Sequence, residues 1–455
     1  MFQTIRKKYF GPWSFNKHVL LVAIPFALQQ LLVSCMGIID SIMVAWIGEV
    51  SAVGTAAQIE TLCSSVAFGA ISGTGIYAAQ YYGARKRLSL QRTFGLSIIL
   101  AIVNGLVWLA IAQLGGQTIM NFYLSDPAVI ESGWAYLKVV CFSYVFNSIA
   151  FCFSYLFRCM QKPKVPLVIG IIAMITNCCF NYVLIFGVGP FPELGVVGAA
   201  VGTVIAQVVS VICYVVYSIN THQPFIGSFQ EMFGLTIDFC KPIFRRIYPL
   251  IFNELMFGLG TTLFVKAFGA LGTQSMDAYY VGAKIYDLFN AAVVGVSSAT
   301  AAILGSALGA NQIDHAMKEA DYFIGLASMM AIGTTIFIMV TSPLLVGCFG
   351  LQDPLVHSLA VSIVMVFAIK IALRLFIVIV FSALRAGGDA KVLTVLDSGI
   401  MWCVGLPSAF IAVWCGLTNI ALVFLVTQIE QVVRVFVGMH RFNSKKWVVN
   451  LTQGA

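Results

Sequence analysis

The sequence predicts an all-α membrane protein with twelve transmembrane helices in two six-helix lobes, related by a pseudo-twofold axis along the membrane normal. Two observations give this fold class. First, 60% of the 455 residues are hydrophobic and only 10% are charged, whereas a soluble domain typically has about 25% charged residues. Second, the carboxyl half repeats the amino half: Pro25 and Pro249 are 224 residues apart, and Arg158 and Arg385 are 227 apart.

The repeat extends through both halves with nearly constant spacing. Further matched positions are Gly48 with Gly272, Gly83-Ala84 with Gly309-Ala310, Asp126-Pro127 with Asp353-Pro354, and Lys164-Val165 with Lys391-Val392. Because each half has an even number of helices, both halves cross the membrane in the same orientation. The longest polar interval, 220–244, joins them. We therefore predict an amino-terminal lobe at 1–219, a cytoplasmic linker at 220–244, and a carboxyl-terminal lobe with its tail at 245–455.

Each half contains six apolar stretches of the length that a helix needs to cross a bilayer, about 20 residues. Leu, Ile, Val and Phe follow no period of two along these stretches, which favours a helical bundle over a membrane barrel. The predicted spans lie near 17–44, 54–80, 92–114, 130–156, 165–188, 196–219, 245–270, 278–304, 318–348, 356–383, 392–415 and 417–438.

The charges between these spans predict the topology. Lys and Arg gather at both termini and in the loops that join spans 2–3, 4–5 and 6–7. The alternate loops hold no base, and their charged residues are the acids Glu49, Asp126, Glu193, Asp277 and Asp353. The positive-inside rule then places both termini in the cytoplasm. No cleaved signal peptide is recognisable, and we expect a multi-pass protein of the bacterial inner membrane. The net charge of +8 thus reflects topology and contact with lipids, not nucleic-acid binding.

Several other classes of protein and site are not supported. The twelve cysteines are scattered and the five histidines are not clustered, so we predict no metal site and no cofactor. The sequence has no His-Glu-x-x-His, Gly-x-Ser-x-Gly or phosphate-binding glycine motif, which argues against an enzyme and an ATP-driven pump. We expect a monomer.

Asp40 is the first candidate functional residue. A charge at the bilayer centre costs at least about 2.5 kcal/mol, and Asp40 has no obvious basic partner in its half. Asn177 and Asn181 lie four residues apart, on one face of a helix. A carboxylate and two amide oxygens can bind Na⁺, or Asp40 can carry a proton. The alternative is an aspartate that only packs helices, protonated or bridged by water.

The carboxyl half has a larger network of ionisable residues. Lys284 and Asp287 are three residues apart and can pair. Two bases four residues apart, Lys370 and Arg374, need counter-ions in apolar surroundings. The candidate counter-ions are Glu254, Asp287 and Asp397. Such a network either holds the lobe together or exchanges with substrate or protons during a functional cycle.

Other residues are candidates for movement or for lining a cavity. Pro25 and Pro249 kink their helices, as a fixed bend or as one that changes between states. Glu254 follows the second kink and is the acid best placed to act directly, or to attract a cationic compound. Glu60 and Gln30 either line a cavity or satisfy neighbouring polar groups.

The motifs resemble those of the MATE family, the multidrug and toxic compound extrusion antiporters. The resemblance covers nearly the whole chain and rests on the order and duplication of several strings. They are Ile39–Val44, Trp46–Gly48, Gln80–Arg85, Leu156–Arg158, Gln161–Pro163, Asn177, Asn181, Gly187, Gly195–Ala200, Leu308–Ala310, Leu384–Lys391, Asp397, Trp402 and Pro407.

The resemblance implies two six-helix lobes in a V shape and export of amphipathic, often cationic compounds in exchange for Na⁺ or H⁺ by alternating access. It also implies that Asp40 couples ion to substrate, accompanied by Asn177 and Asn181. The second residue of that pair is commonly an aspartate in the family, whereas this chain has Asn181 and thus one carboxylate fewer. The coupling ion therefore remains open. The alternative function is a flippase for lipids or lipid-linked oligosaccharides, whose phosphates Lys370 and Arg374 would attract.

Overall fold

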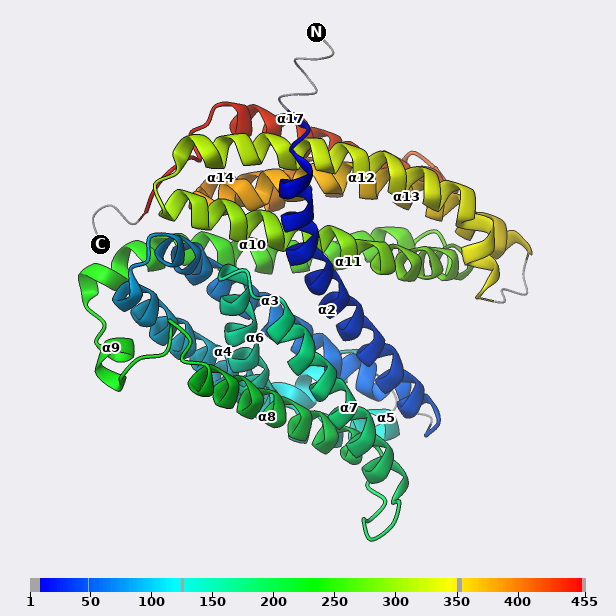
Figure 1. Cartoon of the computed structure of the whole chain (residues 1–455). Coiled ribbons are helices and arrows are strands. Elements are labelled where there is room, and N and C mark those ends of the chain that lie inside the picture. Colours follow the sequence, from blue (N-terminus) through cyan, green and yellow to red (C-terminus); the bar gives the residue numbers. More distant parts are fainter. Residues whose placement is uncertain (1–8, 48, 124–126, 350–353, 452–455) are drawn as a thin grey trace. The chain divides into compact units, whose positions relative to one another are not determined.

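The computed structural model describes residues 9–47, 49–123, 127–349 and 354–451, and every regular element in these ranges is a helix (Figure 1). Gly48, Asp126, Asp353 and the side chain of Asp277, all named above, lie outside this description. The elements are α2 (Trp13–Ala45), α3 (Val50–Gly83), α4 (Arg87–Tyr123), α5 (Pro127–Val140), α6 (Ser143–Cys159), α7 (Lys164–Phe186), α8 (Val196–Asn220), α9 (Phe229–Phe233), α10 (Ile237–Gly269), α11 (Thr273–Gly309), α12 (Ile313–Gly347), α13 (Pro354–Ala386), α14 (Ala390–Thr394), η1 (Val395–Gly399), η2 (Met401–Gly405), α15 (Leu406–Trp414), α16 (Ile420–Thr427) and α17 (Ile429–Asn443).

These helices account for all twelve predicted spans. Within the described residues, eleven helices are long and apolar enough to cross a membrane, and the number is twelve when the bent pair α5 and α6 counts as one span. One boundary differs clearly, because the span expected at 245–270 already begins at Ile237. The polar interval before it contains the short helix α9, capped by reciprocal hydrogen bonds between Ser228 and Glu231.

The span predicted as one helix at 130–156 is broken. Its two parts, α5 and α6, meet at a bend of 49°. At the break the side-chain amide of Gln113, on α4, donates a hydrogen bond to the backbone carbonyl of Lys138 at 2.8 Å. A side chain that takes a carbonyl out of the helical ladder in this way is a recognised cause of kinks. Sequence periodicity does not reveal such an insertion.

The eleventh span also departs from a regular α-helix. Between α14 and α15 the chain forms two consecutive π-helical turns, η1 and η2. Asp397, one of the predicted site residues, lies in η1. Turns of this type are rare and are frequently found at functional sites.

The chain packs as two compact units. One comprises Leu28–Ile251, here called the amino-terminal unit, and the other joins the residues up to Ala27 with those from Phe252 onward, here called the carboxyl-terminal unit. The division by packing therefore differs from the division by repeat, since α2 and α10 each contribute to both units. In each helix the division falls two residues beyond the proline, Pro25 or Pro249.

Specific contacts hold the first part of α2 in the carboxyl-terminal unit and the first part of α10 in the amino-terminal unit. The ring of Phe15, in the first part of α2, packs against Tyr322 and Phe323 of α12, with ring centroids 5.3 and 5.2 Å apart. The guanidinium group of Arg246, in the first part of α10, donates a hydrogen bond of 2.8 Å to the hydroxyl of Tyr77 on α3. The two long helices are therefore anchored at their first parts in one unit and continue in the other.

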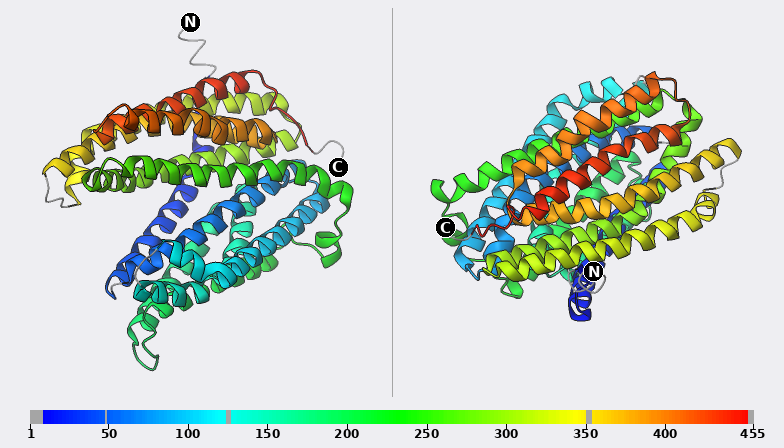
Figure 2. Two further views of the ribbon diagram at one scale, coloured as in Figure 1. Left: turned by 180° about the vertical axis from the view of Figure 1, so that it is seen from behind. Right: turned by 90° about the horizontal axis from the view of Figure 1, so that it is seen from above.

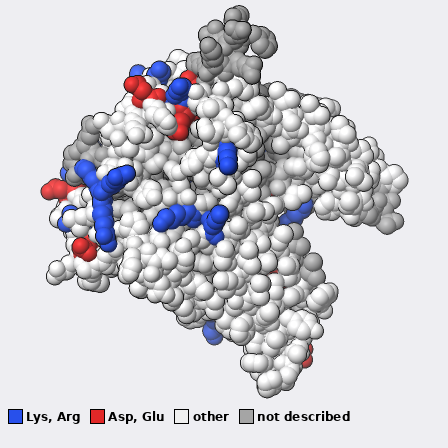
Figure 3. All heavy atoms as spheres, viewed as in Figure 1, with Lys and Arg blue, Asp and Glu red and all other residues white. Residues whose placement is uncertain are grey.

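The two units repeat the same pattern of neighbouring helices (Figure 2). In the amino-terminal unit α3 packs against α4 and α6, and α7 packs against α8; in the carboxyl-terminal unit α11 packs against α12 and α13, and α15 packs against α16. This is the internal duplication that the sequence predicts. In the face shown in Figure 3, most of the surface is uncharged and Lys and Arg occur in only a few places. Exposed apolar side chains such as Leu114, Ile332 and Val340 suit a surface in contact with lipid.

Candidate functional site

Asp40 lies in a hydrogen-bonded network inside the amino-terminal unit. The side-chain amide of Asn181, on α7, donates a hydrogen bond to the Asp40 carboxylate at 2.8 Å and another to the side-chain oxygen of Asn177 at 3.3 Å. The Asn177 amide in turn donates to the hydroxyl of Thr203, on α8, at 3.3 Å. The three residues predicted from the sequence are thus brought together, and Thr203 is a fourth member that sequence reasoning missed.

Thr203 is oriented by its own helix, because its hydroxyl donates to the backbone carbonyl of Ala199 at 3.0 Å. The hydroxyl oxygen is therefore left as an acceptor for Asn177. The available signal was a hydroxyl residue inside the very apolar stretch 196–220. That signal is weak, because Ser and Thr commonly bond the preceding turn of their own helix.

Asn181 has one polar atom to spare. Its side-chain oxygen is buried and has no hydrogen-bond partner among the residues that the structure describes. A buried acceptor without a partner is costly, unless a ligand uses it. The oxygen faces Gly202 on α8, where an added Cβ would overlap it. Gly202 therefore makes room for the amide that contacts Asp40.

Replacing Gly202 by Ala is expected to displace Asn181 and impair the site. Overpacking of this kind costs about 1–3 kcal/mol of stability, and loss of the Asn181–Asp40 hydrogen bond should reduce activity further. Gly170→Ala, on α7, is the matched control, because a Cβ there meets no atom within 4 Å. Thermal unfolding and transport assays of both variants check this; equal behaviour of the two would contradict it.

A second carboxyl group, that of Glu60 on α3, lies near Asp40. The two acids repel each other electrostatically, and both also interact with the hydroxyl of Tyr136. Tyr144 is buried beside them, and its hydroxyl has no hydrogen-bond partner within the described part of the chain. Both tyrosines belong to the apolar core to which the helices from α2 to α8 all contribute. Glu60 and Asp40 therefore interact electrostatically within the amino-terminal unit.

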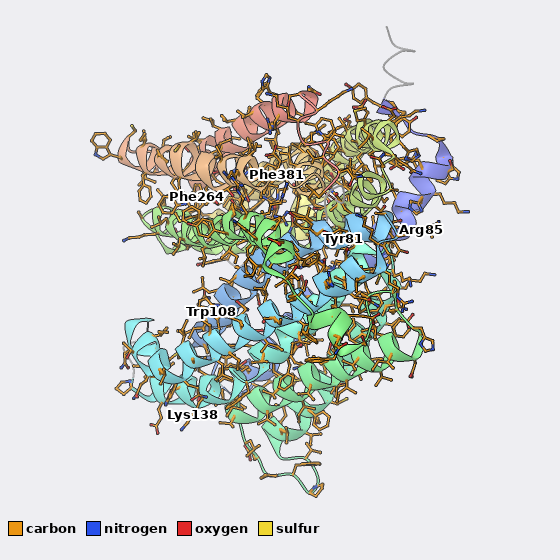
Figure 4. All side chains as sticks on the ribbon, turned by 90° about the vertical axis from the view of Figure 1, so that its left-hand side faces the viewer. Tyr81, Arg85, Trp108, Lys138, Phe264 and Phe381 are labelled. Carbon is orange, nitrogen blue, oxygen red and sulfur yellow. The ribbon has the colours of Figure 1, made fainter. Side chains whose placement is uncertain are left out.

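The part of the chain that the structure describes contains no base paired with either of these acids. Within the described residues, no Lys or Arg nitrogen lies within 4.0 Å of the Asp40 or Glu60 carboxylate. Two adjacent negative charges in apolar surroundings are unfavourable unless a proton or a cation neutralises one of them. At the repeat spacing of 224 residues, the counterparts of Asp40 and Glu60 are Phe264 (Figure 4) and Lys284. The acidic pair is therefore confined to the amino-terminal half.

The carboxyl-terminal unit has its own polar centre around Asp397. The Asp397 carboxylate lies 3.2 Å from the guanidinium group of Arg434 and accepts a hydrogen bond of 3.1 Å from the side-chain amide of Asn253. Arg434 also lies 3.4 Å from Glu430 and donates to the backbone carbonyl of Asp397 at 2.9 Å. Its side chain is completely buried. Arg434 thus pairs with two acids, Glu430 on α17 and Asp397 in the π-helical turn η1.

Glu254 forms a separate ion pair. Its carboxylate lies 3.6 Å from the guanidinium group of Arg385 on α13.

The position that corresponds to Arg385 in the amino-terminal half is occupied by Arg158, which donates to the side-chain oxygen of Gln29 at 3.3 Å. Gln29 also donates to Ser154 at 3.1 Å, while no hydrogen bond of Gln30 is found among the described residues. Of the two adjacent glutamines, Gln29 therefore makes the contacts with α6.

Two of the three candidate counter-ions of Lys370 and Arg374 form their ion pairs with other bases. They are Glu254 and Asp397, which pair with Arg385 and Arg434, two arginines that were not among the candidate site residues. The third candidate, Asp287, attracts Lys370 electrostatically. The i, i+4 spacing of Glu430 and Arg434 was a usable sign of the second pair.

The predicted Lys284–Asp287 pair also differs from expectation. The two side chains are exposed and attract each other electrostatically, but the described atoms include no ion pair between them within 4.0 Å.

Pro25 and Pro249 lie inside the continuous helices α2 and α10, so neither proline ends its helix.

These features define a class: a polytopic helical membrane protein of two repeated units, with a cluster of acids inside one of them. The family model MatE matches residues 25–183 and again residues 249–427, so that both matches begin at the repeated prolines. The chain therefore belongs to the MATE family.

The chain is similar along most of its length to individual curated relatives, and its fold is similar to solved structures. The chain is 24% identical over 433 residues to the uncharacterized transporter YisQ of Bacillus subtilis, covering 93% of each chain. It is 23% identical over 407 residues to the probable multidrug resistance protein NorM of Thermotoga maritima, covering 88% of this chain and 86% of that one. A crystal structure of MATE in complex with MaL6 superposes with a TM-score of 0.86 at 17% identity, covering 95% of this chain and 97% of the other.

Proposed function

We propose that this protein exports amphipathic, often cationic compounds in exchange for H⁺ or Na⁺ by alternating access. The observation that carries the proposal is the pair of neighbouring carboxyl groups, Asp40 and Glu60, without a base within 4.0 Å among the described residues. A proton or cation stabilises such a pair by neutralising one of its charges, and a charge that arrives and leaves would couple ion movement to transport. Relatives named as probable multidrug resistance proteins support the export of drugs.

The surroundings of Asp40 suit either ion. The carboxylate, the unpaired Asn181 oxygen and the hydroxyl of Thr203 are oxygen groups of the kind that hard cations prefer. A proton needs only one carboxylate, and Asp40 then gains an O–H donor while it keeps an oxygen that accepts from Asn181. In both cases neutralisation weakens the charge-assisted hydrogen bond from Asn181 to Asp40.

This change at Asp40 supplies a means of coupling. Asp40 lies on α2, which contributes to both units, so that a shift of α2 alters the packing of each. In the proposed cycle, the ion enters from outside, neutralises Asp40 and promotes release of the exported compound. The protein then reorients, releases the ion inside and binds a new substrate. Glu254, half-buried and paired with Arg385, is the proposed contact for a cationic group in the other unit.

The proposed location is the inner membrane of a bacterium, with both termini in the cytoplasm and the protein acting as a monomer. The distribution of bases supports the topology. Arg85 belongs to a cluster of bases in the loop after α3, whereas Lys138 is exposed at the opposite end of the amino-terminal unit (Figure 4). The positive-inside rule assigns the end with more bases to the cytoplasm.

Competition during transport separates this function from a lipid flippase. Protein in liposomes should move a fluorescent cationic dye when an ion gradient is imposed, and tetraphenylphosphonium should inhibit that movement. A flippase for lipid-linked oligosaccharides should instead be inhibited by an undecaprenyl pyrophosphate lipid. Inhibition by the pyrophosphate lipid alone would contradict the proposed export of drugs.

A further inference from the structure

Two cationic side chains, Lys370 and Arg374, lie one turn apart on α13. This helix contains the most apolar 18-residue stretch among the membrane-spanning helices that the structure describes. At the repeat spacing of 227 residues, their counterparts in the amino-terminal half are Ser143 and Asn147. The duplicated fold therefore accepts neutral residues at these positions, and the two charges are a feature of the carboxyl-terminal unit alone.

The ammonium group of Lys370 is surrounded by aromatic rings. Its nitrogen lies 5.2 Å from the centroid of the Tyr286 ring, 5.5 Å from Phe367 and 5.4 Å from Phe424. The rings contact one another, with centroids 4.6 Å apart for Phe367 and Phe424 and 4.9 Å for Tyr286 and Phe367. Cation–π attraction holds the charge in place. Among the described residues, no carboxylate lies within 4.0 Å of the ammonium.

Arg374 also forms no ion pair with any residue that the structure describes. Its Nε is buried and has no hydrogen-bond partner in the described part of the chain. Electrostatic attraction reaches Glu254 and Tyr286, but the Glu254 carboxylate is already paired with Arg385 at 3.6 Å. A guanidinium group with an unused N–H in apolar surroundings suits an anion, which it can bind through parallel hydrogen bonds.

The acids of the unit do not supply that anion. Asp397 and Glu430 share Arg434 at 3.2 and 3.4 Å. Glu430 and Asp287 attract Lys370 only from beyond ion-pair distance, and Asp287 is exposed and attracted by Lys284 as well. The carboxyl-terminal unit therefore contains a basic pair, Lys370 and Arg374, whereas the amino-terminal unit contains an acidic pair.

We propose that Lys370 and Arg374 bind the anionic head of an amphipathic compound, a carboxylate, sulfonate or phosphate, whose apolar part lies against the neighbouring aromatic rings. This proposal rests on the proposed export function and extends its substrates to amphipathic anions. Arg374 supplies the directed N–H donors, and Lys370 supplies a point charge. Tyr286, Phe367 and Phe424 supply the apolar surface.

Binding of three probes with one ring system tests the proposal. The probes are 2-naphthoate, 2-naphthalenemethanol and (2-naphthylmethyl)trimethylammonium, measured by equilibrium dialysis with the purified full chain in detergent. Naphthoate is expected to bind at least about tenfold more tightly than the alcohol, since charge-assisted hydrogen bonds are about twice as strong as neutral ones. Lys370→Gln and Arg374→Gln should each abolish this preference for the anion. Lys266→Gln is the matched control, because Lys266 is an exposed base in α10 and should leave binding unchanged.

Equal affinities for the three probes, or unchanged naphthoate binding in both α13 variants, would overturn the proposal. If a Gln variant does not fold, Arg374→Lys keeps the charge and loses the planar donors, and should still weaken naphthoate binding several-fold. Because no gradient is present, loss of export with intact naphthoate binding counts against the proposed function alone, and the reverse result counts against the anion site alone.

A competition arm identifies the source of the anionic head. Displacement of naphthoate by phosphatidylglycerol but not by phosphatidylcholine assigns the site to an anionic lipid. Displacement by neither lipid assigns it to soluble amphipathic anions. Equal displacement by both lipids would show that head-group charge does not matter, and would contradict the proposal.

Discussion

Asp40→Asn is expected to abolish export driven by an ion gradient while leaving the protein folded. Asparagine keeps the shape of the side chain and can still hydrogen-bond to Asn181, so the packing of α2 against α7 is preserved. The amide carries no charge and cannot exchange a proton, so ion binding no longer changes its state. A gradient of one pH unit supplies about 1.4 kcal/mol per proton, and 100 mV supplies about 2.3 kcal/mol per charge.

Together these sustain a concentration ratio of a few hundred-fold when one net proton charge enters for each exported molecule, by the rule that about 1.4 kcal/mol equals tenfold. In the variant the ratio should fall to about one, as for passive exchange. Dye accumulation and thermal unfolding are measured on the same preparation. Glu193→Gln is the control, because Glu193 is an exposed acid in the loop between α7 and α8 and its loss should leave export unchanged. Export by the Asp40→Asn variant at the wild-type level would remove Asp40 from the mechanism.

Among the substitutions proposed here, Arg434→Met is expected to lower the free energy of unfolding most. Arg434 is fully buried and holds Asp397 and Glu430 at 3.2 and 3.4 Å. Its removal leaves two acids close together without a base, and breaking a buried ion pair in this way costs about 3–5 kcal/mol. The melting midpoint of the purified protein should fall strongly. Lys446→Met, which removes an exposed base near the same end of the chain, should change it little.

A combined variant separates charge from packing. When Arg434→Met is joined with Asp397→Asn and Glu430→Gln, no charge remains unpaired, and a buried ion-pair network replaced as a whole is often neutral in stability. Recovery of most of the lost melting temperature is therefore expected. If the combined variant is no more stable than Arg434→Met alone, the network stabilises the unit through shape and not through charge balance.

The fold followed from two properties that are written directly in the chain. Long apolar stretches must form helices in a bilayer, and the spacing of Pro25 and Pro249 revealed the duplication. What periodicity could not supply were features set by side chains from other helices. Gln113 breaks the fourth span by taking the carbonyl of Lys138, and the assignment of the two halves of α2 to different units depends on packing that lies far away in the sequence.

The site was predictable where its residues share a helix face or lack a local partner. Asn177 and Asn181 are spaced by one turn, and Asp40 has no obvious basic partner in its half. The resemblance to the MATE family then grouped the three residues in advance. The pairing of Glu254 with Arg385 and of Asp397 with Arg434 could not, because the order of helices around each unit decides which base reaches which acid. Thr203 was missed for the same reason, since only the contact of α7 with α8 brings it to Asn177.

The most direct test of ion-coupled export is dye uptake into everted membrane vesicles with a Na⁺ gradient and a pH gradient imposed separately, on the wild type and on Asp40→Asn. The predicted result is uptake in the wild type under one of the two gradients, and none in the variant under either. That result would identify the coupling ion and locate its site in the amino-terminal unit. Absence of uptake under both gradients with folded wild-type protein, or equal uptake by the variant, would contradict the account.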